Sequence, residues 1–277
     1  MTDAPFHARM PSMEAQRRRR NPGGASEGPP LPGNVALFLD IDGTLVPFAE
    51  RPDAVTIDAG LHALLAGLRT ATQGAVALIS GRSIADIDAL FAPVRFAMAG
   101  QHGAERRSAD GTLHYHAPLA ARLGGPAAAL RALVRERPGL LLEEKGASLA
   151  LHYRGAPALA QLAEREARQA VVALGDDFEL QAGKLVFEVK PSGKDKGTAI
   201  DEFMAEAPFA GRRPVFVGDD LTDELGFERV NRIGGDAVKV GPGPTRARWR
   251  LADAGAVRHW LSRLESRLRT GNEGEVT

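Results

Sequence analysis

The chain has 277 residues, and its 35 basic and 35 acidic side chains cancel, so no charge excess favours nucleic acid or an anionic membrane as a partner. With 44% hydrophobic residues it can bury one large core or two modest ones, and the lack of cysteine excludes disulfides, thiolate metal sites and cysteine nucleophiles. No apolar run reaches the roughly 18 residues of a membrane span, and no signal-peptide pattern precedes the first strand, so we expect a cytoplasmic protein.

Residues 1–33 differ from the rest of the chain, because an arginine run at Arg17–Arg20 is mixed there with glycine, proline and serine and no apolar face recurs. This composition predicts a disordered tail. The arginine run could contact a nucleic acid or an acidic partner, but a solvated tail explains it equally well, and we expect no nucleic-acid partner.

From Val35 onward, apolar runs alternate with helix-like stretches: "VALFL", "AGLHALLAGLRTAT", "GAVALIS" and "SIADIDALFAPV". This order predicts a parallel sheet with helices on its faces. A helical stretch, "DKGTAIDEFMAEAPF", and two strands, "PVFVGDD" and "AVKVG", follow near the other end. We therefore predict one α/β core domain built from residues 34–103 and 189–267, followed by a flexible tail over 268–277.

The intervening residues, 104–188, have a different pattern. Strand-like segments, "TLHYHAP", "GLLLEEKGASLALHYR" and "FELQAGKLVFEVKP", surround the alanine-rich helical stretch "APALAQLAEREARQAVVAL". We predict that this insertion forms a second, smaller α/β domain.

Two carboxylates, Asp40 and Asp42, follow the first buried strand. Ligands of parallel sheets bind where the strands end, and residues two apart in a strand face the same side, although Asp42 can instead lie on a turn helped by Gly43. Unpaired buried charges cost several kcal/mol, so a converging pair requires a cation or donors between its members. The alternative is that Asp42 only caps a turn.

Polar groups also follow three further strands or loops. Ser80 and the turn amides of Gly81 and Arg82 could hold an oxyanion, or could only cap the next helix. Lys194 and Lys196 lie at a helix start, where the dipole disfavours cations unless an anion is near, although a surface loop is the alternative for either lysine.

Four acids gather after the strand "PVFVG": Asp219, Asp220, Asp223 and Glu224. Carboxylates this close repel one another without a metal ion, so this segment is the candidate metal site.

The order of these motifs, "DxDGT", serine, lysine and acidic pair, resembles the phosphatases of the haloacid dehalogenase superfamily. Segments such as "AGQHGAERR", "LEEKGASLALHYR" and "GKLVFEVKPSGKDKGTAI" further resemble trehalose-6-phosphate phosphatases, over about residues 35–262. The resemblance implies a Rossmann-like core with helices on both faces, and it makes the insertion a cap domain that chooses the substrate.

For the chemistry, the resemblance implies that Asp40 is the nucleophile and Asp42 the general acid and base. It implies Mg²⁺ held by Asp40, the backbone carbonyl of Asp42, and Asp219. Asp220 would support the metal shell or orient the lysine. Ser80 and a lysine would bind the phosphoryl oxygens, and alignment with the family's "KG" pair favours Lys196.

The cap is then expected to close over the sugar and to bind its hydroxyls with Glu143, Lys145 and Glu188. His152, Tyr153 and Arg154 could equally be cap packing. His102 and Glu105 are expected to line the same pocket from the passage between core and cap. The complete expected substrate-binding set is Gly81, Arg82, His102, Glu105, Glu143, Lys145 and Glu188.

Three alternatives stay open at this point. The substrate could be sucrose phosphate, a glucosyl- or mannosyl-glycerate phosphate, or a simple hexose phosphate. The "DxD" could belong to a glycosyltransferase, although that class does not need the serine, lysine and "GDD" in this order. The chain could also be a binding module on a decayed phosphatase fold. The sequence does not determine the oligomeric state, although a monomer is favoured.

Overall fold

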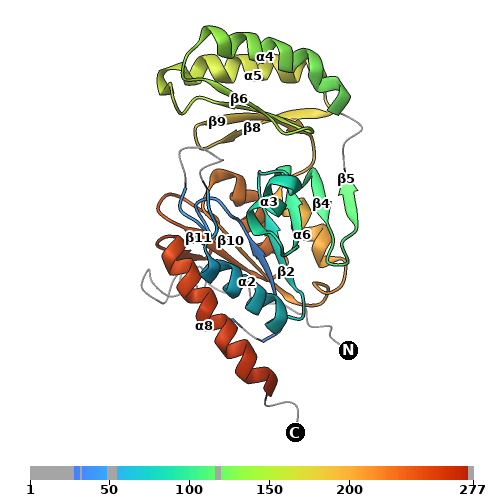
Figure 1. Cartoon of the computed structure of the whole chain (residues 1–277), viewed down its shortest axis with the longest axis vertical. Helices are drawn as coiled ribbons and strands as arrows, with labels where there is room; N and C mark the ends of the chain where they lie inside the picture. The colour runs from blue at the N-terminus through green and yellow to red at the C-terminus, as the bar shows by residue number, and fades with distance from the viewer. Residues whose placement is uncertain (1–27, 32, 49–54, 116–119, 274–277) are drawn as a thin grey trace, which may run out of the picture.

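The computed structural model describes residues 28–31, 33–48, 55–115 and 120–273, so residues 1–27 and 32 of the predicted N-terminal tail and 274–277 of the predicted C-terminal tail lie outside the described residues. The chain forms a large sheet of eight strands and a small sheet of four, each covered by helices (Figure 1). This architecture confirms the predicted α/β core with an inserted α/β domain.

The large sheet has the strand order β12-β11-β10-β1-β2-β3-β4-β5. The strands from β12 to β3 are parallel, whereas β4 and β5 are antiparallel. Their bounds are β1 Val35–Leu39, β2 Val76–Ile79, β3 Ala97–Gly100, β4 Glu105–Arg107, β5 Leu113–Tyr115, β10 Arg213–Gly218, β11 Asp236–Val240 and β12 Trp249–Leu251.

Strand β1 lies at the centre of this sheet, between β10 and β2, and is buried on both faces. Its continuous apolar sequence is typical of a parallel strand with helices on both sides. Leu37 and Leu39 face one hydrophobic cluster and Phe38 faces the other. The carboxyl end of β1 therefore opens at the middle of the sheet edge.

Helices cover both faces of the large sheet. The cluster around Leu37 and Leu39 includes residues of α2 (Ala59–Ala71), α3 (Ile84–Phe91) and α8 (Ala254–Glu273). The cluster around Phe38 includes residues of α6 (Lys196–Met204) and α7 (Glu224–Arg232). Within the described part of the chain, no helix is apolar over a length sufficient to span a bilayer.

The small sheet forms the cap, which comprises residues 120–191. Its antiparallel strands have the order β6-β7-β9-β8, and α4 and α5 lie on the face away from the core (Figure 1). The other face looks toward the large sheet. The bounds are α4 Gly124–Glu136, β6 Leu141–Glu144, β7 Leu149–His152, α5 Ala160–Leu174, β8 Phe178–Gly183 and β9 Val186–Pro191.

Strand pairing corrects the predicted boundaries of the insertion. Strands β4 and β5 continue the large sheet by pairing onto β3, so residues 105–115 belong to the core and not to the cap. This pairing satisfies the free main-chain groups that β3 would otherwise present as an edge strand. At the other boundary, β9 runs unbroken to Pro191, past the predicted end of the insertion at residue 188.

Parts of both predicted tails pack on the core. Pro29 and Leu31 are buried, and the indole Nε1 of Trp260 donates to the Pro29 carbonyl at 3.3 Å, so residues 28–31 pack on the core. Helix α8 continues to Glu273, and Leu268 is buried against the same cluster. Burial of these apolar side chains explains why residues 28–31 and the C-terminal part of α8 pack on the core.

Candidate active site

A tight turn after β1 brings the first two aspartates to the sheet edge. Asp40 is 4% exposed and directly follows the strand, whereas Asp42 begins a turn closed by a bridge to Val46. Gly43 in this turn has φ +87°, and a Cβ there would lie 2.3 Å from a carboxylate oxygen of Asp219. Glycine is required for both reasons, since it permits this backbone conformation and lets Asp219 approach the turn.

Helix α6 carries Lys196 into the site from its first turn. Asp195 caps the helix by accepting from the backbone N–H groups of Gly197 and Thr198, and the Thr198 hydroxyl accepts from the Asp195 N–H in return. This capping box fixes the start of the helix. Lys194, by contrast, pairs with Glu202 at 2.6 Å, so only Lys196 lies in the cleft.

The ammonium group of Lys196 is buried between two carboxylates. Its Nζ donates to Asp40 Oδ1 at 2.7 Å and to Asp223 Oδ1 at 2.6 Å. Burial opposes the charge, yet attraction to Asp223 and Asp40 raises the pKa of Lys196 above its ordinary value. Lys196 is therefore a fixed cation beside the predicted nucleophile.

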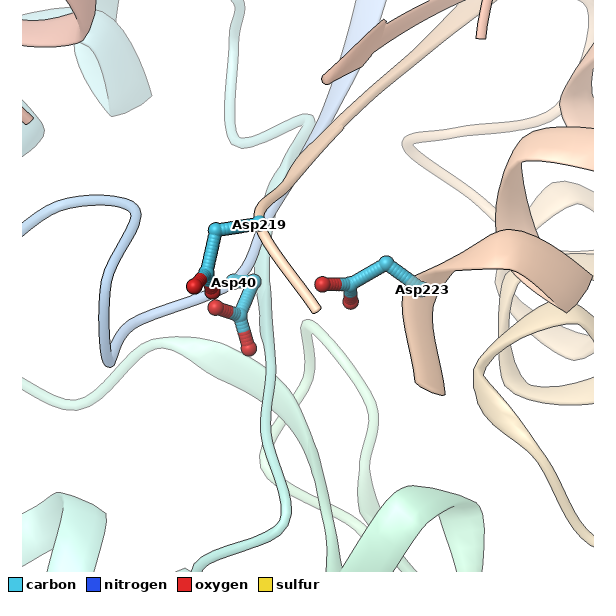
Figure 2. Close-up of side chains that lie close together, drawn as sticks. All are labelled: Asp40, Asp219 and Asp223. Atoms are coloured by element: carbon cyan, nitrogen blue, oxygen red, sulfur yellow. The ribbon is translucent and has the colours of Figure 1, made fainter. Parts of the chain in front are cut away.

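Three carboxylates surround this single cation. Asp40, Asp219 and Asp223 each offer an oxygen within 4.8 Å of the others, and Figure 2 shows their side chains converging. Burial raises the pKa of Asp40 well above its usual range, in spite of Lys196. Burial, assisted by repulsion from Asp223, raises the pKa of Asp219 to about 6.

One lysine does not compensate two buried carboxylates and a half-buried third, so the cluster favours a further cation. Carboxylate oxygens are the ligands that Mg²⁺ prefers, and the donor set therefore fits this ion. Asp40 and Asp219 were both predicted as ligands. Both oxygens of Asp223 are already engaged, one by Lys196 and the other by the Asp220 N–H at 2.8 Å, which leaves Asp40 and Asp219 as the better candidates.

Asp220 was predicted either to support the metal shell or to orient the lysine. The carboxylate that contacts Lys196 is Asp223, so Asp220 does not orient the lysine. The short helix at Leu221–Asp223 turns Asp223 back under the sheet edge, where it is fully buried, whereas the half-buried Asp220 lines the cleft. Asp223 was one of the four acids noted in the sequence. The sequence does not show that the turn directs its side chain toward Lys196.

The turn after β2 carries the predicted serine and arginine. Ser80 is buried and its Oγ accepts from the Arg82 N–H at 3.1 Å. The Arg82 guanidinium forms two hydrogen bonds to Asp42, from Nε at 2.6 Å and from Nη2 at 2.7 Å. Arg82 therefore fixes the orientation of the second aspartate.

Two of the predicted cap residues also bridge to the core. Lys145 donates from Nζ to the Gly81 carbonyl at 2.9 Å and lies 3.5 Å from the carboxylate of Glu188. Glu188 Oε2 lies 3.0 Å from His102 Nε2, and its Oε1 accepts from Ser148 at 2.7 Å. The cap thus meets the core through the side chains that were expected to bind sugar.

The charges in this bridge are set by burial and pairing. Burial opposes ionisation of Glu188, but Lys145 and His102 lower the pKa of this carboxyl far below its ordinary value. Burial lowers the pKa of His102, and the adjacent Glu188 offsets this effect only in part. The site therefore presents Glu188 as an anion next to a histidine that resists protonation.

The third predicted cap residue, Glu143, has its partner within the cap. Its Oε2 lies 2.9 Å from Nε2 of His152, and both side chains line the cleft. The hydrogen bond from His152 and the charge of Lys145 lower the pKa of Glu143 against the effect of burial. His152 is therefore a cleft residue, a role that the sequence left open.

Glu105 does not line the cleft, which corrects its predicted role. Its carboxylate accepts from the Ile84 N–H at 2.9 Å, at the start of α3, and from the side-chain amide of Gln101. Arg106 forms ion pairs with Glu202 of α6 and with Glu206, just after this helix, and Arg107 pairs with Asp88 of α3. The "ERR" segment, which forms β4, therefore connects this strand to α3 and to the region of α6 through ion pairs and hydrogen bonds.

All other predicted site residues except Glu188 line one cleft between the core and the cap. Phe48, Arg154, Lys184 and Thr222 contribute to it without having been predicted. The predicted residues that it brings together are Asp40, Asp42, Ser80, Gly81, Arg82, His102, Glu143, Lys145, Lys196, Asp219 and Asp220, and Glu188 is in direct contact with this set.

A parallel sheet that ends in this Asp, Ser, Lys and Asp set beneath a cap defines a phosphatase of the haloacid dehalogenase type. Comparison of folds agrees: the structure of a haloacid dehalogenase-like hydrolase from B. subtilis superposes with a TM-score of 0.57 at 14% identity, covering 82% of this chain and 98% of that one. The trehalose-phosphatase family model matches residues 38–254, and the chain belongs to this family.

Individual relatives agree with this assignment. A protein of Escherichia coli (strain K12) named trehalose-6-phosphate phosphatase is 46% identical over 253 residues, which cover 90% of this chain and 93% of the relative. The crystal structure of a trehalose-6-phosphate phosphatase related protein has a TM-score of 0.70 at 30% identity and covers 86% of this chain and 99% of that one. The predicted family and enzyme class are therefore confirmed.

Proposed function

We propose that this enzyme hydrolyses trehalose 6-phosphate to trehalose and phosphate with Mg²⁺ as cofactor, as the last step of trehalose biosynthesis. The observation that carries the proposal is the ion pair of Asp40 with Lys196 in a cleft that is also lined by Glu143 and Lys145 of the cap. The name of the E. coli relative supports the choice of substrate. A cytoplasmic, monomeric enzyme without a nucleic-acid partner stays our prediction.

In the first step, an oxygen of Asp40 attacks phosphorus, and the bond from phosphorus to the sugar oxygen breaks. Asp42 gives its proton to that oxygen, so the sugar leaves as a neutral alcohol. In the second step, water attacks the aspartyl phosphate and Asp42 takes up its proton. The bond from phosphorus to Asp40 breaks, and the nucleophile is restored.

Fixed groups around Asp40 assist both steps. Lys196 holds Oδ1 of Asp40, which leaves Oδ2 as the attacking atom, and the ammonium group would also bind a phosphoryl oxygen. Ser80 would bind another phosphoryl oxygen. Bound by Asp40, Asp219 and the backbone carbonyl of Asp42, Mg²⁺ would supply positive charge that offsets the repulsion between phosphate and nucleophile.

The cap would supply the recognition of the sugar. Glu143, Lys145 and Glu188 combine acceptors and a donor, which suits the hydroxyl groups of a disaccharide. Closure over the cleft would exclude water other than the reactant.

A panel of phosphates tests the substrate. Release of phosphate is measured for trehalose 6-phosphate, sucrose 6-phosphate, a glucosylglycerate phosphate, glucose 6-phosphate and p-nitrophenyl phosphate, with Mg²⁺ or with chelator. We expect the highest kcat/KM for trehalose 6-phosphate and no turnover in chelator. A preference for another sugar phosphate would refute the substrate, and full turnover in chelator would refute the cofactor.

A pair of neighbouring glutamates tests the cap. Glu143→Ala should lower kcat/KM for trehalose 6-phosphate by about 5- to 150-fold, since a lost hydroxyl contact in a closed site costs about 1–3 kcal/mol. Glu144→Ala is the matched control, because Glu144 is exposed and pairs with Arg131 at 2.6 Å. Equal losses in the two variants, or equal losses on p-nitrophenyl phosphate, would refute sugar binding by Glu143.

A further inference from the structure

Phe48 is an aromatic side chain of the core that reaches the cap. It follows the turn that carries Asp42, lines the cleft, and is 39% exposed. The catalytic steps proposed above make no use of this ring, so its position requires another explanation.

Two cations of the cap contact this one ring. The guanidinium carbon of Arg154 lies 4.3 Å from the ring centroid, and the Lys184 Nζ lies 4.5 Å from it. Both distances are within the roughly 6 Å over which a cation is attracted to the face of an aromatic ring. Like charges repel, so a shared ring is a specific way to hold both of them at one point of the core.

Arg154 and Lys184 belong to one structural unit of the cap. Arg154 follows β7, and Lys184 lies in the turn between β8 and β9. The Tyr153 N–H donates to the Leu185 carbonyl at 3.0 Å and ties the two segments together. A contact with Phe48 therefore fixes the β8–β9 turn as a whole.

This turn is far from the place where the cap rejoins the core. Strand β9 begins at Val186, next to the turn, and ends at Pro191, where the chain leaves the cap. Six residues of strand span about 20 Å. A contact at the distant end restrains rotation of the cap more strongly than one near the connection.

Two of the other contacts between core and cap use groups that the substrate is proposed to need. Lys145 binds the Gly81 carbonyl and Glu188 binds His102, and all four belong to the proposed substrate site. The ring of Phe48 has no such role in that site. It can hold the cap in place while those polar groups turn to the sugar.

We propose that Phe48 is a positioning residue: through Arg154 and Lys184 it fixes the β8–β9 turn on the core, and so places Glu188 of β9 over the reacting centre. The inference rests on the proposed function insofar as the substrate is a sugar phosphate that needs the closed cap. It adds to that function a residue of the core that determines cap position through its aromatic ring.

Conservative variants separate the ring from its volume. Phe48→Leu keeps an apolar side chain without a π-face, whereas Phe48→Tyr keeps the face. Loss of two cation–π contacts corresponds to a decrease of about 5- to 30-fold in kcat/KM. We expect Phe48→Leu to lower kcat/KM for trehalose 6-phosphate by that factor, with less than about twofold change on p-nitrophenyl phosphate, and Phe48→Tyr to restore the parent value.

A double-mutant cycle tests the partner. Lys184→Met is combined with Phe48→Leu, and thermal melts confirm that all variants fold. If Lys184 acts through the ring, the double variant should be no worse than Phe48→Leu by more than about twofold. Additive losses would show that Lys184 acts independently of Phe48 and would overturn the proposal, as would equal activity of Phe48→Leu and the parent.

Hydrogen exchange provides a readout without substrate. Backbone amides of residues 179–190 should exchange faster in Phe48→Leu than in the parent or in Phe48→Tyr. Unchanged exchange would overturn the proposed positioning. If the parent prefers another sugar phosphate, the proposed substrate fails, whereas the exchange experiment still decides the role of Phe48.

Discussion

The contact between Asp223 and Lys196 gives a sharp test of the site. Asp223 is fully buried, its Oδ1 accepts from Lys196 at 2.6 Å, and its Oδ2 accepts from the Asp220 N–H at 2.8 Å. The substitution Asp223→Asn preserves the shape and one acceptor but removes the negative charge that faces Lys196.

The expected magnitude follows from what remains around Lys196. Removal of one partner from a buried ion pair costs about 3–5 kcal/mol when the other charge is left alone. Lys196 keeps Asp40 at 2.7 Å, and loss of Asp223 also relieves repulsion among the carboxylates, so we expect about 2–3 kcal/mol. For a protein of this size, that loss corresponds to a fall in Tm of about 4–12 °C.

Activity should fall as well, because Asp223 holds the lysine that is proposed to bind the phosphoryl group. We expect kcat to fall by about 10- to 100-fold, with a smaller change in KM, since the loss concerns the transition state more than the bound substrate. Thermal melts and steady-state phosphate release, both with Mg²⁺, measure the two effects.

Asp220→Asn is the matched control. Asp220 accepts from the Asp223 N–H and donates its own N–H to Asp223, and an asparagine can preserve both hydrogen bonds. Its Tm should therefore fall by less than about 2 °C. An equal fall in Tm in the two variants, or a larger fall in Asp220→Asn, would refute the assignment of Asp223 as the partner of Lys196.

Four further predictions concern the nucleophile, the metal, the N-terminal segment and a buried histidine. Asp40→Asn should fold and lose turnover by more than 10-fold, and residual activity within about tenfold of the parent would contradict a covalent role. Mg²⁺ should raise the Tm of the chelator-treated parent but not of Asp219→Ala, and an equal rise in both would exclude Asp219 as a ligand. Deletion of residues 1–27 should leave Tm and activity unchanged. Deletion of residues 1–31 should lower Tm, because residues 28–31 pack on the core, and equal Tm values of the two deletion variants would contradict this contribution. The pKa of His102 is lowered in the folded protein, so the unfolded chain takes up the proton first as the pH falls through about 6.5. The free energy of unfolding should therefore decline below that pH by up to about 1.4 kcal/mol per pH unit. His102→Gln should flatten this decline, and an unchanged slope would assign the decline to other groups.

The sequence predicted the catalytic edge of the sheet because strand order determines it. The carboxyl ends of parallel strands meet at one edge, so the residues after β1, β2 and β10 had to converge. A lysine at a helix start needs an anion near it, but this argument left Lys194 and Lys196 both open, and only the resemblance to the family favoured Lys196. The structure supplies that anion as Asp40 and Asp223.

Other features depend on contacts between distant segments and were not predictable. The pairing of β4 with β3 depends on tertiary packing, so residues 105–115 were placed in the insertion. A carboxylate in a motif does not reveal its direction, and Glu105 faces the start of α3 instead of the cleft. The contact of Phe48 with Lys184 joins residues 136 positions apart, which no local pattern records.

Two of the three cap residues expected to bind the sugar differ in how they connect to the core. Glu143 is held by His152 within the cap, so its contribution is confined to the cap. Lys145 instead bonds to the carbonyl of Gly81, which adjoins Ser80 in the proposed phosphoryl site. If Lys145 binds the sugar as proposed, the sugar would act on the loop proposed to hold phosphate, and one hydrogen bond would couple recognition to positioning.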